Sequence, residues 1–282
     1  MSSSVVLRVG LAVGALSAPF AAPLPAQGAS AGRDVILATT TSLYDTGLLD
    51  SIVPIFERQS GYHVKVVAVG SGQALAMGRR GDADVAFVHS PAAERAFMDA
   101  GYGVRRRVVA SNYFTIAGPA ADPARVREAA DAVEALRRIA DSGRPFVSRG
   151  DSSGTHAREL ALWAQVGVRA AGAAYIETGQ GMAATLLVAN ERTAYVLTDR
   201  ATLGALRTHV DLVALRAPER ALANIYHVIE LNPSGHPRMN VEGGRAFADF
   251  VVSDQVQSIL AHFGEGRLGE AMFVPAWGRE PT

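Results

Sequence analysis

The chain has 282 residues, which is long enough to form two lobes that each bury a core of their own. Hydrophobic residues make up 49% of the composition and charged residues 19%, which excludes an intrinsically disordered chain. The 27 basic and 27 acidic residues balance, so no net charge favours nucleic acid or an anionic membrane surface. We therefore expect a globular protein that has no nucleic-acid partner.

The first 30 residues differ in composition from the rest of the chain. They contain no acidic residue, one basic residue at Arg8, and an apolar run from Val9 to Leu24 that Pro19 and Pro23 interrupt. This pattern is typical of a secretory signal peptide, and the prolines argue against a membrane span. We predict that residues 1–30 are a signal peptide. The chain has no cysteine to carry a lipid anchor, so we expect the exported protein to be free in the periplasm.

Strands and helices alternate in the next part of the chain. The predicted strands are 34–38, 62–69 and 83–89, and the predicted helices are 45–60, 74–80 and 92–100. This alternation indicates an α/β fold with mainly parallel sheets, in which ligands bind beyond the carboxyl ends of the strands. The polar turns Thr39–Ser42, Gly70–Gln73 and Ser90–Pro91 all lie at that end.

The alternation continues to the end of the chain. The predicted strands are 113–117, 144–147, 174–177, 194–198 and 224–231, and the predicted helices are 122–140, 157–163, 182–191, 202–208, 243–252 and 254–263. Their order predicts a discontinuous lobe I of residues 31–116 and 224–282, with an inserted lobe II of residues 117–223. The strands that cross between the lobes, near 113–117 and 224–231, would then form a hinge.

Four turns combine hydroxyl groups or glycine with a following helix. They are Thr39–Ser42, Gly70–Gly72, Arg149–Thr155 and Thr178–Gly181. Each one alone is explained by ordinary helix capping. Four at the same end of predicted strands favour convergence on a cleft, where hydroxyls and helix N-termini could surround a small tetrahedral oxyanion.

The third of these turns carries a permanent positive charge. Arg149 supplies a planar fork of donors, and charged hydrogen bonds are about twice as strong as neutral ones. Asp151 is expected to orient Arg149 rather than to touch the anion, because two negative groups repel each other. The alternative is a simple surface salt bridge between the two residues.

The same loop also fits a different class of protein. Gly150–Gly154 satisfies the Gly-x-Ser-x-Gly pattern of a hydrolase nucleophile, with Ser152 at its centre. The downstream acids and histidines that could complete a triad are Asp199, Asp211, His209, His227 and His236. No particular acid or base stands out among them, so a secreted serine hydrolase using Ser152 is the alternative function.

The seven histidines do not have the spacing of metal ligands, and we expect neither a metal site nor a cofactor. We expect packing or surface positions for His63, His89 and His227. His156 follows the Arg149 loop, and we expect it on a helix surface.

Taken together, these segments resemble the tungstate-binding proteins of bacterial ABC transporters, which have the type II periplasmic binding protein fold. The matching segments are 38–42, 67–75, 81–85, 91–94, 146–156, 177–182 and 197–200. The Arg-x-Asp-x-Ser-Gly-Thr pattern of residues 149–155 is also similar to phosphate-binding proteins. That pattern alone therefore identifies an oxyanion but not its central element.

The resemblance implies a set of ligand-binding residues from both lobes. They are Thr40, Thr41, Ser42 and Ser71 from lobe I, and Arg149, Ser153, Gly154 and Thr155 from lobe II. The anion would be bound through its oxygens. Three places differ from the family pattern: Leu43–Tyr44 is bulky, Ser152 replaces an acidic residue, and Asn224–His227 is an unusual return strand.

The implied function is that of a monomeric periplasmic receptor that closes its lobes on tungstate and delivers it to an inner-membrane ABC permease. Such a receptor performs no chemistry. Alternatives of the same fold are receptors for molybdate, phosphate or sulfate. Phosphate carries a proton near neutral pH and favours a carboxylate acceptor, so the donor-rich turns mildly favour the unprotonated ions. Tungstate and molybdate are nearly equal in size, and the residues do not separate them.

Overall fold

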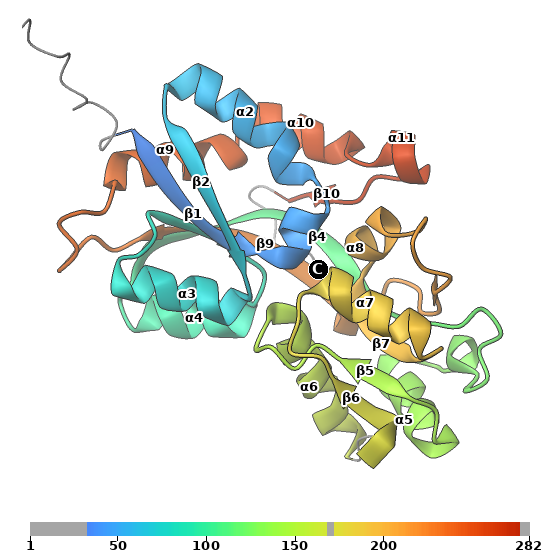
Figure 1. Ribbon diagram of the computed structural model, residues 1–282. Helices are drawn as coiled ribbons and strands as arrows, with labels where there is room; N and C mark the ends of the chain where they lie inside the picture. The colour runs from blue at the N-terminus through green and yellow to red at the C-terminus, as the bar shows by residue number, and fades with distance from the viewer. Residues whose placement is uncertain (1–32, 168–171, 277–282) are drawn as a thin grey trace, which may run out of the picture.

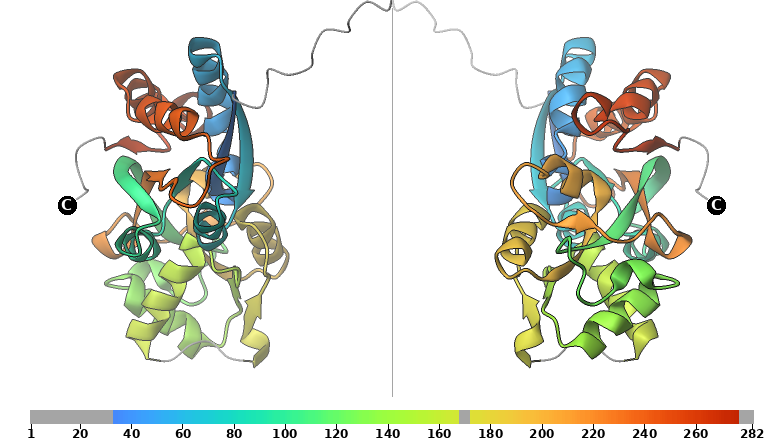
Figure 2. Two further views of the ribbon diagram at one scale, coloured as in Figure 1. Left: turned by 90° about the vertical axis from the view of Figure 1, so that its left-hand side faces the viewer. Right: turned by 90° about the vertical axis from the view of Figure 1, so that its right-hand side faces the viewer.

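The computed structural model describes residues 33–167 and 172–276, and the predicted signal peptide lies outside them. Eight of the ten strands in the described residues form one connected path in the order β2-β1-β3-β9-β4-β7-β5-β6, and the other two, β8 and β10, pair with β4. In Figure 1, strands β1 and β2 lie in the upper half of the molecule and strands β5 and β6 in the lower half, and each half has its own helices (Figures 1 and 2). The molecule therefore has two α/β halves joined through its central strands.

The first sheet contains three parallel strands and three antiparallel ones. Its strands are β1 (Asp34–Thr40), β2 (His63–Val69), β3 (Val85–Val88), β4 (Gly103–Gly118), β9 (Ala223–Leu231) and β10 (Val274–Pro275). Strand β1 pairs in parallel with β2 and β3, whereas β9 runs antiparallel to both β3 and β4. The expectation of mainly parallel sheets was therefore wrong for the centre of the molecule.

The second sheet is smaller and shares β4 with the first. Its other strands are β5 (Phe146–Ser148), β6 (Tyr175–Glu177), β7 (Tyr195–Asp199) and β8 (Val213–Ala214). Strand β5 lies in parallel between β6 and β7, and β7 runs antiparallel to the end of β4.

Helices pack on both faces of each sheet. They are α1 (Thr41–Asp45), α2 (Leu48–Ser60), α3 (Ser71–Arg80), α4 (Pro91–Asp99), α5 (Ala132–Ser142), α6 (Gly154–Val166), α7 (Met182–Glu191), α8 (Arg200–Ala205), α9 (Val241–Val251), α10 (Asp254–His262) and α11 (Glu265–Leu268). Helices α2, α9 and α10 cover one face of the first sheet, and α3 and α4 cover the other. In the second sheet, α5 and α6 lie opposite α7 and α8.

The alternation of side chains along a strand explains why the first sheet has a hydrophobic core on each of its two faces. Val35 and Leu37 of β1 pack toward α2 and α9, while the alternate residues Ile36 and Ala38 pack toward α3. Successive residues of a strand point to opposite faces, so an almost continuous apolar run is what a strand buried on both sides requires.

Strand β4 is much longer than the sequence predicts. Only residues 113–117 were expected as a strand, whereas β4 runs from Gly103 to Gly118 and includes the three arginines at 105–107. All three arginines pair with carboxylates of other elements, and Arg107 is the most deeply buried of them. Arg107 is buried and binds Glu230 at 2.7 Å and Asp249 at 2.6 Å.

Two predicted helices have different bounds in the structure. The helix expected over 45–60 is divided at Thr46 and Gly47, where Gly47 has a positive φ of 80°. The helix expected over 122–140 begins only at Ala132. Asp131 caps it by accepting a hydrogen bond from the N–H of Glu134, and the preceding residues form only a short 3-10 turn.

A buried charge cluster joins α4 to the central strands. Glu94 is fully buried, and its Oε2 lies 2.8 Å from Arg106 Nε and 2.9 Å from His227 Nδ1. Its Oε1 accepts a hydrogen bond from the backbone N–H of Ser90 at 2.6 Å. The expected packing position of His227 is therefore accompanied by a polar contact with Glu94.

Replacing Glu94 with Gln should lower the free energy of unfolding by about 3–5 kcal/mol, because it leaves the partly buried guanidinium of Arg106 without its carboxylate partner. Urea denaturation of the purified protein measures this change. The matched control is Glu128→Gln, since Glu128 also pairs with an arginine but lies on the surface. This control should leave the stability unchanged, and equal losses in the two variants would contradict the prediction.

Candidate functional site

Polar turns follow the carboxyl ends of four strands, as the sequence predicts. Thr40 ends β1 and caps α1 by accepting a hydrogen bond from the N–H of Leu43, and Gly70 stands between β2 and α3. Ser153 caps α6 by accepting from the N–H of His156. Helix α6 thus begins at Gly154, within the predicted polar loop, and α3 begins at Ser71.

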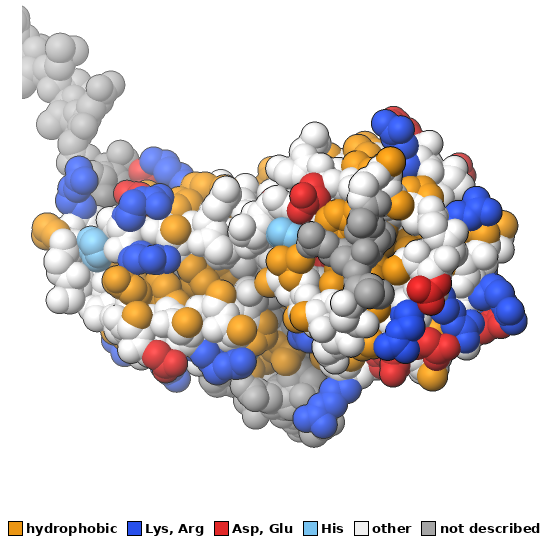
Figure 3. Space-filling model, turned by 90° about the horizontal axis from the view of Figure 1, so that it is seen from below, with side chains coloured by type: hydrophobic (Ala, Val, Ile, Leu, Met, Phe, Trp, Pro, Cys, Tyr) orange, Lys and Arg blue, Asp and Glu red, His pale blue; other side chains and the backbone are white. Residues whose placement is uncertain are grey.

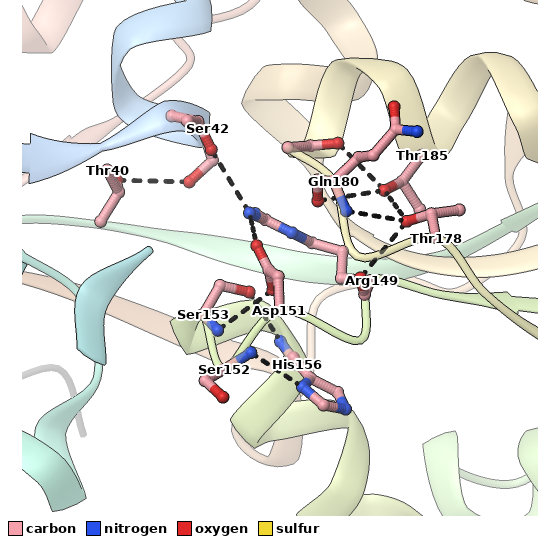
Figure 4. A network of polar contacts seen from close by, with 12 residues as sticks. Thr40, Ser42, Arg149, Asp151, Ser152, Ser153, His156, Thr178, Gln180 and Thr185 are labelled. Atoms are coloured by element: carbon pink, nitrogen blue, oxygen red, sulfur yellow. Dashed lines mark hydrogen bonds and ion pairs between the residues drawn. The ribbon is translucent and has the colours of Figure 1, made fainter. Parts of the chain in front are cut away.

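Arg149 reaches from the loop after β5 to the turn after β1. Its side chain is 1% exposed, and Nη2 donates a hydrogen bond to Thr41 Oγ1 at 3.3 Å. The same nitrogen forms an ion pair with Asp151, whose other carboxylate oxygen accepts from the N–H of Ser153 at 3.1 Å. Figure 4 shows the guanidinium pointing toward the β1–α1 turn, with Asp151 beside it. The interpretation as a surface salt bridge was therefore wrong, because Arg149 is buried and also bonds to Thr41 of the other half.

The turn that begins at Thr178 holds the backbone of the Arg149 loop through two hydrogen bonds. The N–H of Thr178 donates to the carbonyl of Ser148 at 3.0 Å, and the N–H of Gly179 donates to the carbonyl of Arg149 at 2.8 Å. These amides are occupied by the backbone, so the role of this turn is to hold Arg149 in position (Figure 4).

Three buried donors in the predicted turns have no hydrogen-bond partner among the described residues. They are Ser71 Oγ, Arg149 Nε and Thr155 Oγ1. A buried polar group without a partner costs about 1–3 kcal/mol, and more when it is charged. Donors left unpaired in two separate predicted turns, one from each half of the molecule, fit a ligand that is rich in acceptor oxygens.

The two halves are in close contact around this site. A Cβ atom on Gly154 would lie 2.6 Å from the carbonyl oxygen of His89, and one on Gly72 would lie 3.1 Å from the carbonyl oxygen of Ser152. Thr202 Oγ1 donates to the carbonyl of Ser42 at 3.3 Å. Helix α1 also contacts α7 and α8. The turns of the first sheet therefore lie directly against those of the second.

The structure brings some of the predicted ligand-binding residues into direct contact and places others only near the same loop. Arg149 bonds to Thr41, and Thr40 Oγ1 lies 3.4 Å from Ser42 Oγ. Ser71, between Gly70 and Gly72, is placed next to the 151–153 loop by the approach of those two glycines. No hydrogen bond between described side chains joins Ser71 or Thr155 to the other predicted residues.

Sequence reasoning missed the part played by His89. The expected packing position is correct in that the side chain is 2% exposed, but both ring nitrogens are in hydrogen bonds. Nε2 lies 3.0 Å from Ser42 Oγ, and Nδ1 lies 2.9 Å from Asn224 Oδ1. His89 follows β3 at the same sheet edge as the other turns, and that position was a signal that could have identified it.

The hydrolase interpretation is not supported by the surroundings of Ser152. Ser152 is exposed, and its hydroxyl makes no hydrogen bond within residues 33–167 and 172–276. Its backbone N–H donates to His156 Nδ1 at 3.1 Å, so that nitrogen does not act on the hydroxyl. Asp199 instead caps α8, and His227 binds Glu94. Two of the five candidate acids and bases, Asp199 and His227, are therefore engaged elsewhere.

Metal and membrane features can be assessed for the described residues. Within that part of the chain, no group of three or more His, Asp or Glu side chains could hold a metal ion. No described helix has both the length and the apolar character needed to span a bilayer. Basic and acidic side chains are interspersed on the face shown in Figure 3, in agreement with the zero net charge.

Burial shifts the pKa of two groups beside the Arg149 loop. Desolvation lowers the pKa of His89, and Arg149 contributes to this, although Asp199 and the bond to Asn224 oppose it. Burial raises the pKa of Glu159 to about 7, against the opposing effect of the hydrogen bond from Tyr175 at 2.5 Å.

The fold and this donor-lined site define a class of protein, and the comparison with known families gives the same class. The PBP superfamily domain matches residues 25–255. The chain belongs to the PBP (periplasmic binding protein) superfamily.

Within this superfamily, the chain is similar to proteins named for tungstate. It is 43% identical to the tungstate-binding protein TupA of Peptoclostridium acidaminophilum, over 86% of this chain and 85% of that protein. A solved structure of the tungstate ABC transporter from Geobacter sulfurreducens is 42% identical, with a TM-score of 0.75, over 82% of this chain and 98% of that one. TupA from Desulfovibrio alaskensis G20 is 39% identical, with a TM-score of 0.70, over 86% of this chain and 99% of that one.

Glu159 should make the stability depend on pH. Its pKa is about 7 in the folded protein against a usual 4.5, so the folded state holds a proton in this range that the unfolded chain has lost. The stabilisation is therefore full below about pH 4.5 and falls as the pH rises to about 7, by up to about 3 kcal/mol. In Glu159→Gln, the free energy of unfolding from urea denaturation should no longer decrease between about pH 5 and about pH 8.

The control is Glu177→Gln, since Glu177 is exposed, and this variant should show the same decrease as the wild type. A decrease that persists in Glu159→Gln would contradict its assignment to Glu159.

Proposed function

We propose that this protein binds tungstate between its two halves and delivers it to an ABC transporter. The observation that carries the proposal is the buried Arg149, held by Asp151 and Thr41 beside the unpartnered donors of Ser71 and Thr155. Relatives that cover most of the chain bear the name tungstate-binding protein, which supports the same ligand. The protein is a binding component and not an enzyme.

In this proposal eight residues bind the oxygens of the anion. They are Thr40, Thr41, Ser42 and Ser71 from the first sheet and its helices, and Arg149, Ser153, Gly154 and Thr155 from the β5–α6 loop. Hydroxyls and helix N-terminal amides donate to the oxygens, and Arg149 adds the one charged donor in this set. Asp151 stays on Arg149 and keeps the guanidinium oriented.

The donor set supports an unprotonated oxyanion over phosphate. Phosphate near neutral pH carries a proton that needs an acceptor, and the carboxylate in the loop, Asp151, is already bonded to Arg149 and to the N–H of Ser153. The names of the relatives favour tungstate over molybdate and sulfate.

Capture would proceed by closure of two lobes about a hinge. We assign residues 31–116 and 224–282 to lobe I and residues 117–223 to lobe II, with β4 and β9 as the crossing strands. The anion contacts both lobes only when they are together, so it stabilises the closed state. The receptor would act as a monomer in the periplasm, exported by the signal peptide of residues 1–30, and would pass tungstate to an inner-membrane permease.

Arg149→Ala should weaken tungstate binding by about 10- to 100-fold, because a charged hydrogen bond contributes about 1.5–3 kcal/mol. Titration calorimetry with tungstate, molybdate, sulfate and phosphate measures both affinity and selectivity. The exposed Arg144, in the same segment, provides the control variant Arg144→Ala, which should bind as the wild type does. Absence of heat with all four anions in the wild-type protein would reject the proposed function.

Gly154→Ala should block closure, because its Cβ would lie 2.6 Å from the backbone oxygen of His89. We expect tungstate affinity to fall at least about tenfold, while the thermal stability measured without tungstate stays close to that of the wild type. Gly266→Ala adds the same methyl group where no atom lies within 4 Å, so it serves as the control. Wild-type affinity in Gly154→Ala would show that this close approach is not part of the bound state.

A further inference from the structure

A chain of buried hydrogen bonds connects the central strands to the proposed anion site. Asn224 Nδ2 donates to Asn112 Oδ1 at 2.8 Å and to Tyr226 Oη at 3.0 Å. Asn224 Oδ1 lies 2.9 Å from His89 Nδ1, and His89 Nε2 lies 3.0 Å from Ser42 Oγ. All five side chains are buried.

The side-chain amide of Asn224 determines which atom is the donor and which is the acceptor in each of these hydrogen bonds. Both hydrogens of Nδ2 are used on Asn112 and Tyr226, so it is the carbonyl oxygen of Asn224 that faces His89. An oxygen acceptor requires a donor opposite, so the ring proton of His89 is on Nδ1. In a neutral ring, Nε2 is then an acceptor, and the hydrogen between Nε2 and Ser42 Oγ belongs to the serine.

This arrangement conflicts with the role of Ser42 in binding an oxyanion. The oxygens of the anion only accept hydrogen bonds, and Ser42 has a single hydroxyl hydrogen. While that hydrogen points to His89, the serine presents lone pairs to the anion. A proton on His89 Nε2 reverses the bond, because the ring then donates to Ser42 Oγ and the hydroxyl hydrogen becomes available to the anion.

The charges around His89 determine when this reversal can occur. Burial and the nearby Arg149 lower the pKa of His89, whereas Asp199 and Glu94 act in the opposite direction. The other groups packed on the ring are Tyr226 at 4.8 Å and Phe114 at 6.3 Å between ring centroids. The ring is therefore neutral near pH 7 before binding, and a doubly negative ion beside Ser42 favours its protonated form.

We propose that His89 is a positioning residue for Ser42 and that capture of the oxyanion takes up a proton from solvent onto His89 Nε2. The proposal rests on the proposed function, since it requires the anion to accept from Ser42. The protonated Nε2 of His89 then donates a hydrogen bond to Ser42 Oγ, which leaves the Ser42 hydroxyl hydrogen free to bond to the anion. It also places a positive charge on His89, one hydrogen bond away from the anion. Binding of a dianion and uptake of one proton are then linked, and affinity falls as the pH rises.

Calorimetry of tungstate binding in buffers that differ in ionisation enthalpy tests this linkage. At pH values near 7 and above, tungstate itself carries no proton, so any uptake belongs to the protein. Pipes, Hepes and Tris avoid competing phosphate and sulfate ions. We expect the observed heat to change linearly with buffer ionisation enthalpy, with a slope that approaches uptake of one proton. A slope of zero in a wild-type protein that binds tungstate would overturn this proposal alone, whereas absence of binding would reject the proposed function itself.

Two matched variants show which histidine takes up the proton. In His89→Gln, the side-chain amide can donate to Ser42 at every pH, so we expect tungstate binding without proton uptake and without pH dependence. His156→Gln removes the other histidine beside the Arg149 loop and should keep the wild-type uptake. Uptake that persists in His89→Gln, or that disappears in His156→Gln, would overturn the assignment.

Nitrogen NMR of the wild-type protein labelled in its histidine rings gives an independent readout if His89→Gln does not fold. We expect the Nε2 resonance of His89 to move to the position of a protonated nitrogen when tungstate is added. A ring that remains neutral in the tungstate complex would overturn the proposal.

Discussion

The buried guanidinium of Arg149 is the interaction on which the rest of the site depends. A cation that is 1% exposed is costly unless groups around it offset the lost hydration. Asp151 supplies the countercharge, Thr41 supplies an acceptor from the opposite half, and the Thr178 turn holds the backbone. These contacts preorganise the donor fork without using all of its hydrogens, since Nε has no partner among the described residues.

Much of this arrangement could be predicted because it is local in the chain. A strand, a short turn of hydroxyls or glycine and a helix can be recognised within about 20 residues, and parallel strands bring such turns to one sheet edge. The positions of Thr40, Ser71 and Ser153 at helix starts followed from that pattern. The buried position of Arg149 needed more information, because its partner Thr41 lies 108 residues away in the chain.

The features that were missed depend on partners that are distant in the sequence. Residues 105–107 were not expected in a strand, yet they belong to β4, where Glu230 and Asp249 neutralise Arg107 from another strand and a helix. His89 looked like an ordinary core residue because Asn224, which orients its ring, lies 135 residues further on. Composition and periodicity report the environment of a residue only when its neighbours are close in the chain.

The 16-residue strand β4 has a consequence for how this molecule can be divided. Its first part pairs with β9, and its last part pairs with β7, so one unbroken backbone segment belongs to both sheets. A gene fragment that encodes either half alone would lack a strand or leave an open sheet edge exposed to other chains. The two halves should therefore melt together as a single cooperative unit, and separate expression of either one should give aggregated material.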